Sequence, residues 1–297
     1  MTTKQWSTSS FLTTNETRPN ALIILNTPLV HDELFQEIWR AGDIDADTGS
    51  PSVRLCADGG ANRLYDRYAE RMSSNTSSAA HESTVQADTT LHKEQHDNVK
   101  SSDDVRWLPD VIKGDFDSLQ PDVRRYYEDR GVTIIHDEDQ FSTDLGKCVS
   151  HIVELERDSQ TQYQLIIVGG LSGRLDQTVH TLHALMQLEQ ERDLTWAVGE
   201  ESIACVLGKG DHKLAVSLNR FGKTCGILPL GQQAYVTTSG LEWDLGPTSY
   251  MFPTSLASGV STSNHLVQEN IAISTDVPIV FTAEVRTPQM SNEHGST

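Results

Sequence analysis

The sequence is poor in cysteine, in basic residues and in long apolar runs, and each shortage excludes a class of protein. Its 297 residues include four cysteines, which lie far apart and form no C-x-x-C pair. Neither a zinc cluster nor a disulfide framework is indicated, and we expect free thiols in a cytoplasmic protein. No run of 18 apolar residues exists, so we expect no membrane-spanning helix. The first 20 residues lack the apolar segment of a secretory signal.

The shortage of basic residues is marked. Lys and Arg number 23 against 42 Asp and Glu, which gives a formal net charge of −19. Nucleic acid and anionic membranes are therefore excluded as expected partners, because both require a basic surface. The apolar fraction of 37% is somewhat low for a fully globular chain, so we expect part of the length to lie outside the core.

Short apolar runs alternate with segments of helical periodicity over residues 20–200. Because the runs are apolar throughout, they indicate parallel strands covered on both faces. We therefore predict an α/β fold, a Rossmann-like catalytic domain built on a parallel sheet. The predicted strands are 21–25, 53–57, 109–112, 132–135 and 165–168, and the predicted helices are 31–40, 58–70, 121–129, 143–156 and 174–190.

Three other parts of the chain differ from this pattern. Residues 1–19 are polar and are predicted to be a disordered tail, and residues 72–106 a disordered insertion, since they have no aromatic residue and few large apolar ones. Residues 201–297 show short strand-like runs separated by turns and no helix, which predicts a smaller all-β sandwich. Its expected strands are 202–207, 212–218, 224–229, 233–238, 266–273 and 278–284.

Acidic residues and glycines follow the predicted parallel strands, where ligands bind in such sheets. Asp115 and Asp117 follow the third strand, and in an extended segment both side chains would point the same way. Two adjacent carboxylates need a cation, and Mg²⁺ suits oxygen ligands beside a phosphate. A solvated acidic turn is the alternative. Asp58 and Asp144 are expected nearby.

The other groups allow two interpretations each. Asp58-Gly59-Gly60 fits a helix cap or a close approach of a nucleotide to the backbone. Asp144 is also favourable simply as the start of a helix, with Lys147 as its helical partner. Arg174 and Asp176 fit an ordinary surface pair equally well.

Six segments in order resemble the thiamine pyrophosphokinase family, from about residue 20 to residue 285 apart from the insertion. They include Asp58-Gly59-Gly60-Ala61-Asn62, Gly114-Asp115-Phe116-Asp117-Ser118, Gln140-Phe141-Ser142-Thr143-Asp144 and Gly169-Gly170-Leu171-Ser172-Gly173-Arg174, with Gly240-Leu241-Glu242-Trp243 and Ser261-Thr262-Ser263-Asn264 in the β part. The resemblance is to a eukaryotic member of the family.

The resemblance implies a homodimer that transfers pyrophosphate from ATP to the hydroxyethyl group of thiamine and releases AMP. It implies catalytic and Mg²⁺-binding roles for Asp115, Asp117 and Asp144, with Asp144 the first candidate for a general base on position alone. The implied nucleotide-binding residues are Asp58, Gly59, Gly60, Asn62, Gly170 and Arg174. The implied substrate-binding residues are Gln140, Thr143, Asp176, Trp243, Ser261 and Asn264, the last three acting across the dimer interface.

Phe141 departs from the family pattern, which favours a polar or acidic residue there, and the insertion 72–106 has no assigned role. Two other functions fit the residues. One is a Mg²⁺-dependent transferase acting on another alcohol, such as a pterin. The other is a sensor of thiamine or nucleotide that binds without turnover.

Overall fold

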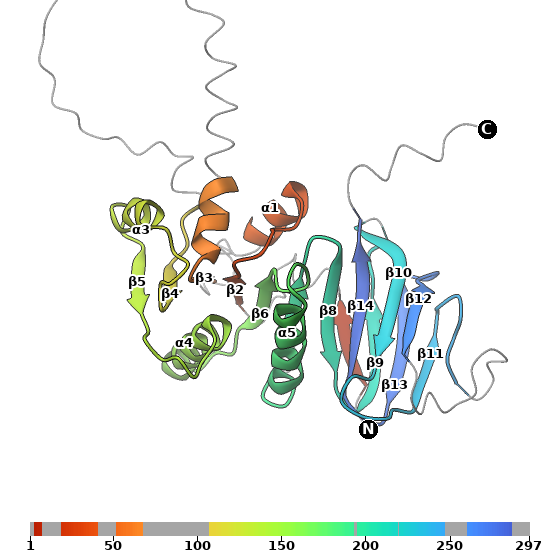
Figure 1. Ribbon diagram of the computed structural model, residues 1–297. Coiled ribbons are helices and arrows are strands. Elements are labelled where there is room, and N and C mark those ends of the chain that lie inside the picture. Colours follow the sequence, from red (N-terminus) through yellow and green to blue (C-terminus); the bar gives the residue numbers. More distant parts are fainter. Residues whose placement is uncertain are drawn as a thin grey trace, which may run out of the picture.

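The structure, a computed structural model, describes residues 3–7, 19–40, 52–67, 107–192, 195–218, 220–246 and 260–286. The insertion predicted at 72–106 lies outside these ranges. The described strands form a ten-stranded sheet and a four-stranded sheet. Helices surround one half of the large sheet, and the small sheet lies beside its other half (Figure 1). No helix of the described residues is both long and apolar enough to cross a bilayer.

Six neighbouring strands of the large sheet run parallel, in the order β7-β6-β2-β3-β4-β5. Five correspond to the apolar runs of the sequence, and β7 is a sixth that those runs did not predict. Every residue of β2, β4, β6 and β7 is buried, as expected for strands covered on both faces. The bounds are β2 Asn20–Ile24, β3 Val53–Ala57, β4 Val111–Gly114, β5 Thr133–His136, β6 Gln164–Val168 and β7 Thr195–Val198.

Helices cover both faces of this parallel part, as predicted. One face packs against α1 (Asp32–Arg40), a helical segment at 60–67 and α3 (Pro121–Glu128). The opposite face packs against α4 (Asp144–Ser159) and α5 (Leu175–Leu188). β3 and β6 lie on either side of β2 in the sheet. From β2 the chain continues to β3 on one side, and from β6 it continues to β7 on the other. The carboxyl ends of β2 and β6 therefore form a topological switch point.

The large sheet does not end where the parallel strands end. β7 pairs antiparallel with β8 (Ser202–Leu207) across a three-residue turn, which is too short for a crossover. The sheet then continues through β14, β10 and β12. The expected separate parallel sheet is therefore six strands of a ten-stranded mixed sheet, and no sheet boundary lies at residue 200. The bounds are β10 Phe221–Leu228, β12 Ser261–His265 and β14 Ile279–Val285.

The small sheet has the order β1-β9-β13-β11 and corrects two sequence predictions. Residues 4–7, predicted to lie in a disordered tail, form β1, a short polar edge strand parallel to β9. Of the strand predicted at 266–273, only the part from Asn270 onward forms, as the start of β13, while buried Leu266 makes an isolated bridge to Leu241 just after β12. The bounds are β1 Lys4–Ser7, β9 Gly210–Ala215, β11 Val236–Ser239 and β13 Asn270–Thr275.

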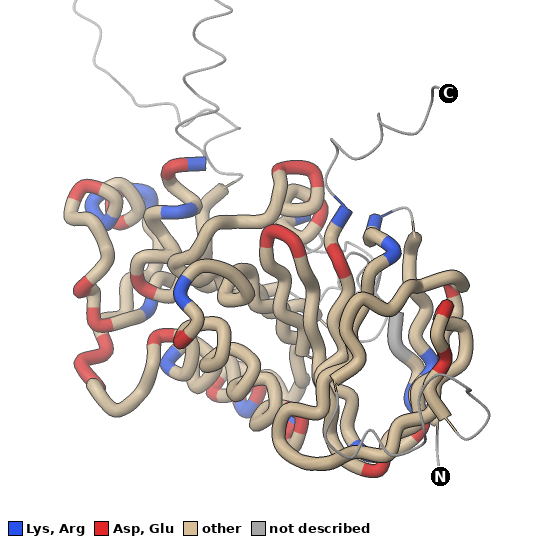
Figure 2. Tube along the Cα trace, turned by 45° about the vertical axis from the view of Figure 1, so that its right-hand side comes forward, with Lys and Arg blue, Asp and Glu red and all other residues tan. Residues whose placement is uncertain are grey.

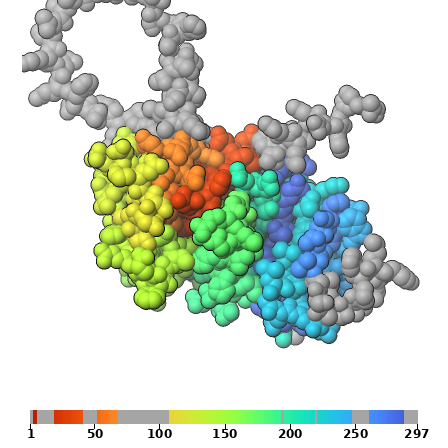
Figure 3. All heavy atoms as spheres, in the orientation of Figure 1, coloured from red at the N-terminus to blue at the C-terminus, as the bar shows by residue number. Residues whose placement is uncertain are grey.

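The helical and β parts share one hydrophobic core. A single buried cluster contains Phe35 and Trp39 of α1, Phe221 of β10 and Ile271 of β13. Figure 3 shows the two parts in contact along their whole visible boundary. The position of each site residue in the ten-stranded sheet is therefore set by one continuous packed body.

Candidate active site

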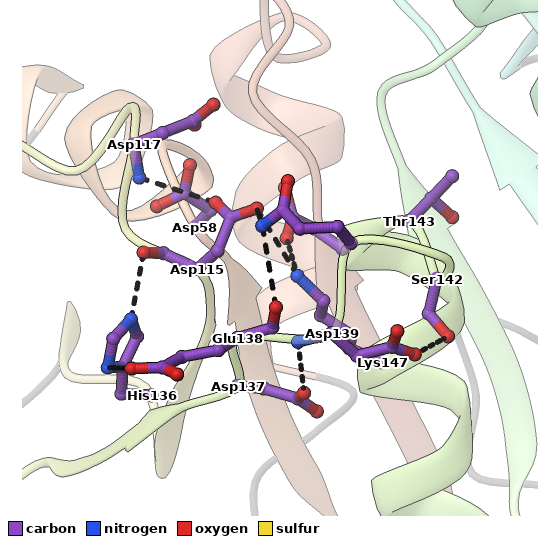
Figure 4. A network of polar contacts seen from close by, with 12 residues as sticks. Asp58, Asp115, Asp117, His136, Asp137, Glu138, Asp139, Ser142, Thr143 and Lys147 are labelled. Atoms are coloured by element: carbon purple, nitrogen blue, oxygen red, sulfur yellow. Dashed lines mark hydrogen bonds and ion pairs between the residues drawn. The ribbon is translucent and has the colours of Figure 1, made fainter.

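Three carboxylates from distant parts of the sequence meet at the carboxyl ends of β3 and β4. Asp58 follows β3, Asp115 follows β4 and Asp144 begins α4, and ligand oxygens of all three lie within 4.8 Å of one another. Gly114 makes this approach possible, because a Cβ there would lie 2.6 Å from Asp58 Cβ and 3.1 Å from Asp144 Oδ1. Figure 4 shows Asp58 and Asp115 side by side, with Lys147 approaching from α4. We call Asp58, Asp115 and Asp144 the acidic trio.

Asp58 does not cap the helix that follows it. Its Oδ2 accepts a hydrogen bond from Ser118 N at 3.0 Å, and its Oδ1 is buried without a hydrogen-bond partner. The residue is 2% exposed and has a φ of +44°. Such strain, with an unsatisfied buried carboxylate oxygen, is typical of a binding site rather than of a stabilising turn.

Asp117 is not one of the three mutually close acids, although its carboxylate lies near Asp58 and Asp144 and contributes to the raised pKa of both. The parallel orientation predicted for Asp115 and Asp117 is wrong, and the metal role of Asp117 stays a prediction. Phe116 between them has a φ of +65°, so the segment is not extended and the two carboxylates do not point the same way. Asp117 Oδ1 accepts a hydrogen bond from Ser118 Oγ at 2.8 Å, while its own N–H donates to Asp115 Oδ1 at 3.3 Å. Figure 4 shows Asp117 directed away from Asp115.

The start of α4 brings further polar groups to the trio. Thr143 is the N-cap, with Oγ1 accepting from Gly146 N at 3.2 Å and lying 3.0 Å from His180 Nε2 of α5. Lys147 Nζ lies 3.4 Å from both Asp115 Oδ2 and Asp144 Oδ1. Gln140 Nε2 donates to Asp115 Oδ2 at 3.2 Å. Gln140 and Thr143 therefore lie beside the trio, and the substrate-binding role implied for them stays a prediction.

Burial and charge act on the acids in opposite directions. Desolvation, with Asp144 and Asp117 nearby, raises the pKa of Asp58 to about 6. Desolvation also raises the pKa of Asp144, although Lys147 opposes the shift. For Asp115 desolvation is outweighed by hydrogen bonds from Asp117 N–H and Gln140 and by the Lys147 charge, so its pKa is lowered. Figure 2 shows further acidic residues along the loop between β5 and α4.

The trio fits a hard divalent cation. Carboxylate oxygens are the ligands that Mg²⁺ prefers, and the partnerless Asp58 Oδ1 is a buried acceptor for which a cation would provide the missing partner. This set differs from the predicted one, in which Asp117 stood in place of Asp58.

The glycines after β3 serve close packing. A Cβ on Gly60 would lie 2.2 Å from Ile24 O, and one on Gly59 would lie 2.3 Å from Asn26 Nδ2. Asn62, predicted to bind nucleotide, uses both ends of its amide within the protein, donating to Ser118 O at 2.8 Å and accepting from Gln120 N at 3.1 Å. It thus holds the loop that carries Asp115.

The turn after β6 joins the turn after β2 at the switch point. Gly170 has a φ of +75°, and its N–H donates to Thr27 Oγ1 at 3.0 Å. Arg174 and Asp176 form an exposed ion pair of 2.5 Å with each other, as the surface-pair interpretation predicted. Phe141 is fully exposed in the loop before α4.

The substrate residues predicted in the β part form a second cluster. Half-buried Trp243 lies with its ring centroid 4.8 Å from that of His265, and Glu242 contacts His265 Nδ1. Asn264, 2% exposed, donates to Trp243 O at 2.8 Å and accepts from Trp243 N at 3.3 Å. Asn264 therefore fixes the Trp243 backbone, and Ser261 Oγ accepts from its amide at 3.4 Å.

This second cluster is far from the acidic trio in the same chain. Seven strands lie between β12 and β4 in the large sheet, which at the usual strand spacing separates them by roughly 30–40 Å. A groove of about 570 Å³ lies over β8, β14, β10 and β12, with Thr262, Ser263, Thr282 and Glu284 in its lining. The structure thus does not bring Trp243, Ser261 and Asn264 to the acids of their own chain.

Sequence reasoning missed three groups at the site. The sequence indicates Lys147 only as a helical partner of Asp144, and it does not predict that Thr27 and His180 lie at the site. Helical periodicity gives no signal for Lys147, because at about 100° per residue it lies away from the apolar face of Leu145, Cys148 and Ile152, although it is buried in the structure.

Comparisons with known proteins match both parts of the chain. A family model described as "Thiamin pyrophosphokinase, catalytic domain" matches residues 48–196, and one described as the vitamin B1 binding domain of the same enzyme matches residues 211–280. Thiamine pyrophosphokinase 1 of Oryza sativa subsp. japonica is 32% identical over 79% of each chain. Thiamine pyrophosphokinase of Saccharomyces cerevisiae is 30% identical over 91% of this chain and 87% of its own.

Solved structures of thiamin pyrophosphokinases share the fold of this chain. The yeast thiamin pyrophosphokinase superposes with a TM-score of 0.71 at 25% identity, covering 95% of this chain and 91% of the yeast one. That of Candida albicans gives a TM-score of 0.69 at 22% identity over 96% and 93% of the two chains, which supports the fold. Since the catalytic-domain model alone spans half of the sequence, and the plant and yeast relatives align over most of it, the chain belongs to the thiamine pyrophosphokinase family.

Proposed function

We propose that this chain transfers the pyrophosphoryl group of ATP to the hydroxyethyl oxygen of thiamine, giving thiamine diphosphate and AMP, in a Mg²⁺-dependent reaction. The observation that carries the proposal is the acidic trio beside the switch point of the parallel strands, in a chain of this family. ATP would lie in the Rossmann-like crevice, near the Gly59 and Gly170 turns, where its phosphates would face backbone N–H groups.

In this proposal Asp58, Asp115 and Asp144 would hold Mg²⁺, which would neutralise charge on the transferring phosphates. Asp117 lies next to Asp115 on an exposed turn, close enough to Asp58 and Asp144 to contribute to the raised pKa of both, and it would add negative charge beside the cation. The hydroxyethyl oxygen forms a bond to the β-phosphorus, and the bond from that phosphorus to the oxygen bridging to the α-phosphorus breaks. Asp144 remains the first candidate to take the hydroxyl proton, on its position at the trio alone.

We further propose that the active form is a homodimer. The separation of Trp243 from the acids supports this, since a second copy is the simplest source of an aromatic wall for the thiamine ring. The net charge of −19 favours approach of the cationic thiazolium. A cytoplasmic location is proposed because Cys56, Cys148, Cys205 and Cys225 are free, buried thiols.

The decisive experiment is AMP formation from ATP, measured with and without thiamine and with other alcohols, pterins included, as acceptors. Thiamine-dependent AMP together with thiamine diphosphate is the expected result. AMP formed preferentially with another alcohol would replace the proposed acceptor, and thiamine binding without AMP would favour a sensor.

A further inference from the structure

We propose that Lys147 is a positioning residue. Its buried ammonium reduces the net negative charge of the acidic trio, and this charge determines how tightly the site binds its cation and the nucleotide. Only the part of this inference that concerns nucleotide binding rests on the proposed function. Lys147 Nζ lies 3.4 Å from Asp115 Oδ2 and 3.4 Å from Asp144 Oδ1, so it bridges two of the three acids. The third, Asp58, has the partnerless Oδ1.

The burial of Lys147 shows how it acts. Its side chain is 1% exposed, so the ammonium does not reach a bound ligand without a rearrangement. It acts through the two carboxylates that it contacts. A buried ammonium is stable only when paired, so Lys147 and the two acids require one another whenever no metal is bound.

Counting charges gives the consequence. Three carboxylates and one ammonium carry a net charge of −2, which a single divalent cation neutralises. Without the ammonium the same acids carry −3, and the metal-loaded site keeps a charge of −1. Losing Lys147 should therefore strengthen the binding of a bare metal ion and weaken the binding of a polyanionic nucleotide. A lysine that only supports the fold would not produce these opposite effects.

The chain offers a matched control in Lys113. This second buried lysine has a side chain 11% exposed, and its Nζ lies 3.3 Å from Asp137 Oδ2. Asp137 is not a member of the trio. Replacing Lys113 removes the same charge and a comparable ion pair without removing a contact to the proposed metal ligands.

The experiment compares Lys147→Met with Lys113→Met. Mn²⁺ binding is measured by calorimetry without nucleotide, and the KM for MgATP is measured in the thiamine-dependent assay. Because an opposite charge at this distance changes proton affinity by about tenfold or more, we expect Lys147→Met to bind Mn²⁺ about tenfold tighter and to raise the KM for MgATP about tenfold. Lys113→Met is expected to change neither constant, although its melting temperature falls.

Two further variants keep the test decisive. Lys147→Gln removes the charge while keeping a donor, and it replaces the Met variant if that one does not fold. Lys147→Arg keeps the charge and should keep wild-type Mn²⁺ affinity. Mn²⁺ binding that is unchanged or weaker in both neutral variants would overturn the proposal. A wild-type protein that forms no thiamine-dependent AMP would refute the proposed function instead, and the Mn²⁺ comparison would still test Lys147.

Discussion

Asp58 is the residue at which binding and stability conflict most directly. Its carboxylate is buried, one oxygen has no partner, and desolvation raises its pKa to about 6, above its ordinary value of 3.8. A carboxyl group with a raised pKa in the folded state costs stability once it ionises. This loss of unfolding free energy begins as the pH rises past the pKa that Asp58 has in the unfolded chain. It reaches its full size once the pH exceeds the pKa of Asp58 in the folded protein.

We therefore predict that Asp58→Asn stabilises the metal-free protein, by on the order of 1–3 kcal/mol at neutral pH and above. The amide oxygen can still accept from Ser118 N. The advantage over wild type should shrink as the pH falls from about 8 through 6 towards 4, because wild-type Asp58 then becomes protonated. Denaturant unfolding of both proteins across this range, with and without Mn²⁺, is the measurement. A variant that is less stable at pH 8, or that retains metal-dependent stabilisation, contradicts the interpretation.

A substitution of Trp243 tests whether the second cluster binds thiamine. It is half-buried against His265, unlike Trp196, which is fully buried in β7. We predict that Trp243→Ala raises the KM for thiamine more than that for ATP, since an aromatic face over a cation contributes ~0.5–2 kcal/mol. Trp196→Phe is the control and should lower the melting temperature with both KM values unchanged. A large loss of melting temperature in Trp243→Ala with a normal thiamine KM would assign Trp243 to the core.

At the scale of elements, the start of α4 determines where Asp144 lies. Thr143 caps this helix and also contacts His180 of α5, so one hydroxyl joins two helices at the site. We predict that Thr143→Ala lowers stability by about 1 kcal/mol through loss of the cap, and lowers kcat because Asp144 is the next residue. Thr143→Ser should retain both. Equal activity of the Ala and Ser variants would show that the cap does not position Asp144.

The elements also show what the sequence could predict. Apolar runs such as Leu165–Val168 identify buried strands because burial on both faces leaves no polar position. The polar edge strand β1 has no such pattern, since its pairing with β9 depends on backbone groups. The separation of Asp115 from Asp117 escaped prediction because it depends on the left-handed backbone of Phe116, a bulky residue that rarely adopts it.

At the scale of the whole molecule, the ten-stranded sheet separates the two sets of site residues. The acidic trio lies near one edge, at β3 and β4, and Trp243 and Asn264 lie near the other, at β12. Both sets belong to one packed body, so no hinge between separate cores would bring them together. If both act on one substrate, each must be supplied by a different copy of the chain.

This leads to a prediction about mixed dimers. In the proposed homodimer, Asp144→Asn and Trp243→Ala would each impair both sites. A heterodimer of the two variants contains one site with Asp144 and Trp243 both intact and one site with both altered. With random assortment half of the dimers are mixed, so refolding equal amounts together should restore about a quarter of wild-type activity. Mixing without refolding, which leaves the dimers unexchanged, is the control. Activity that stays at the mean of the two variants after verified exchange would mean that each chain builds its site alone, and the proposed shared site would be wrong.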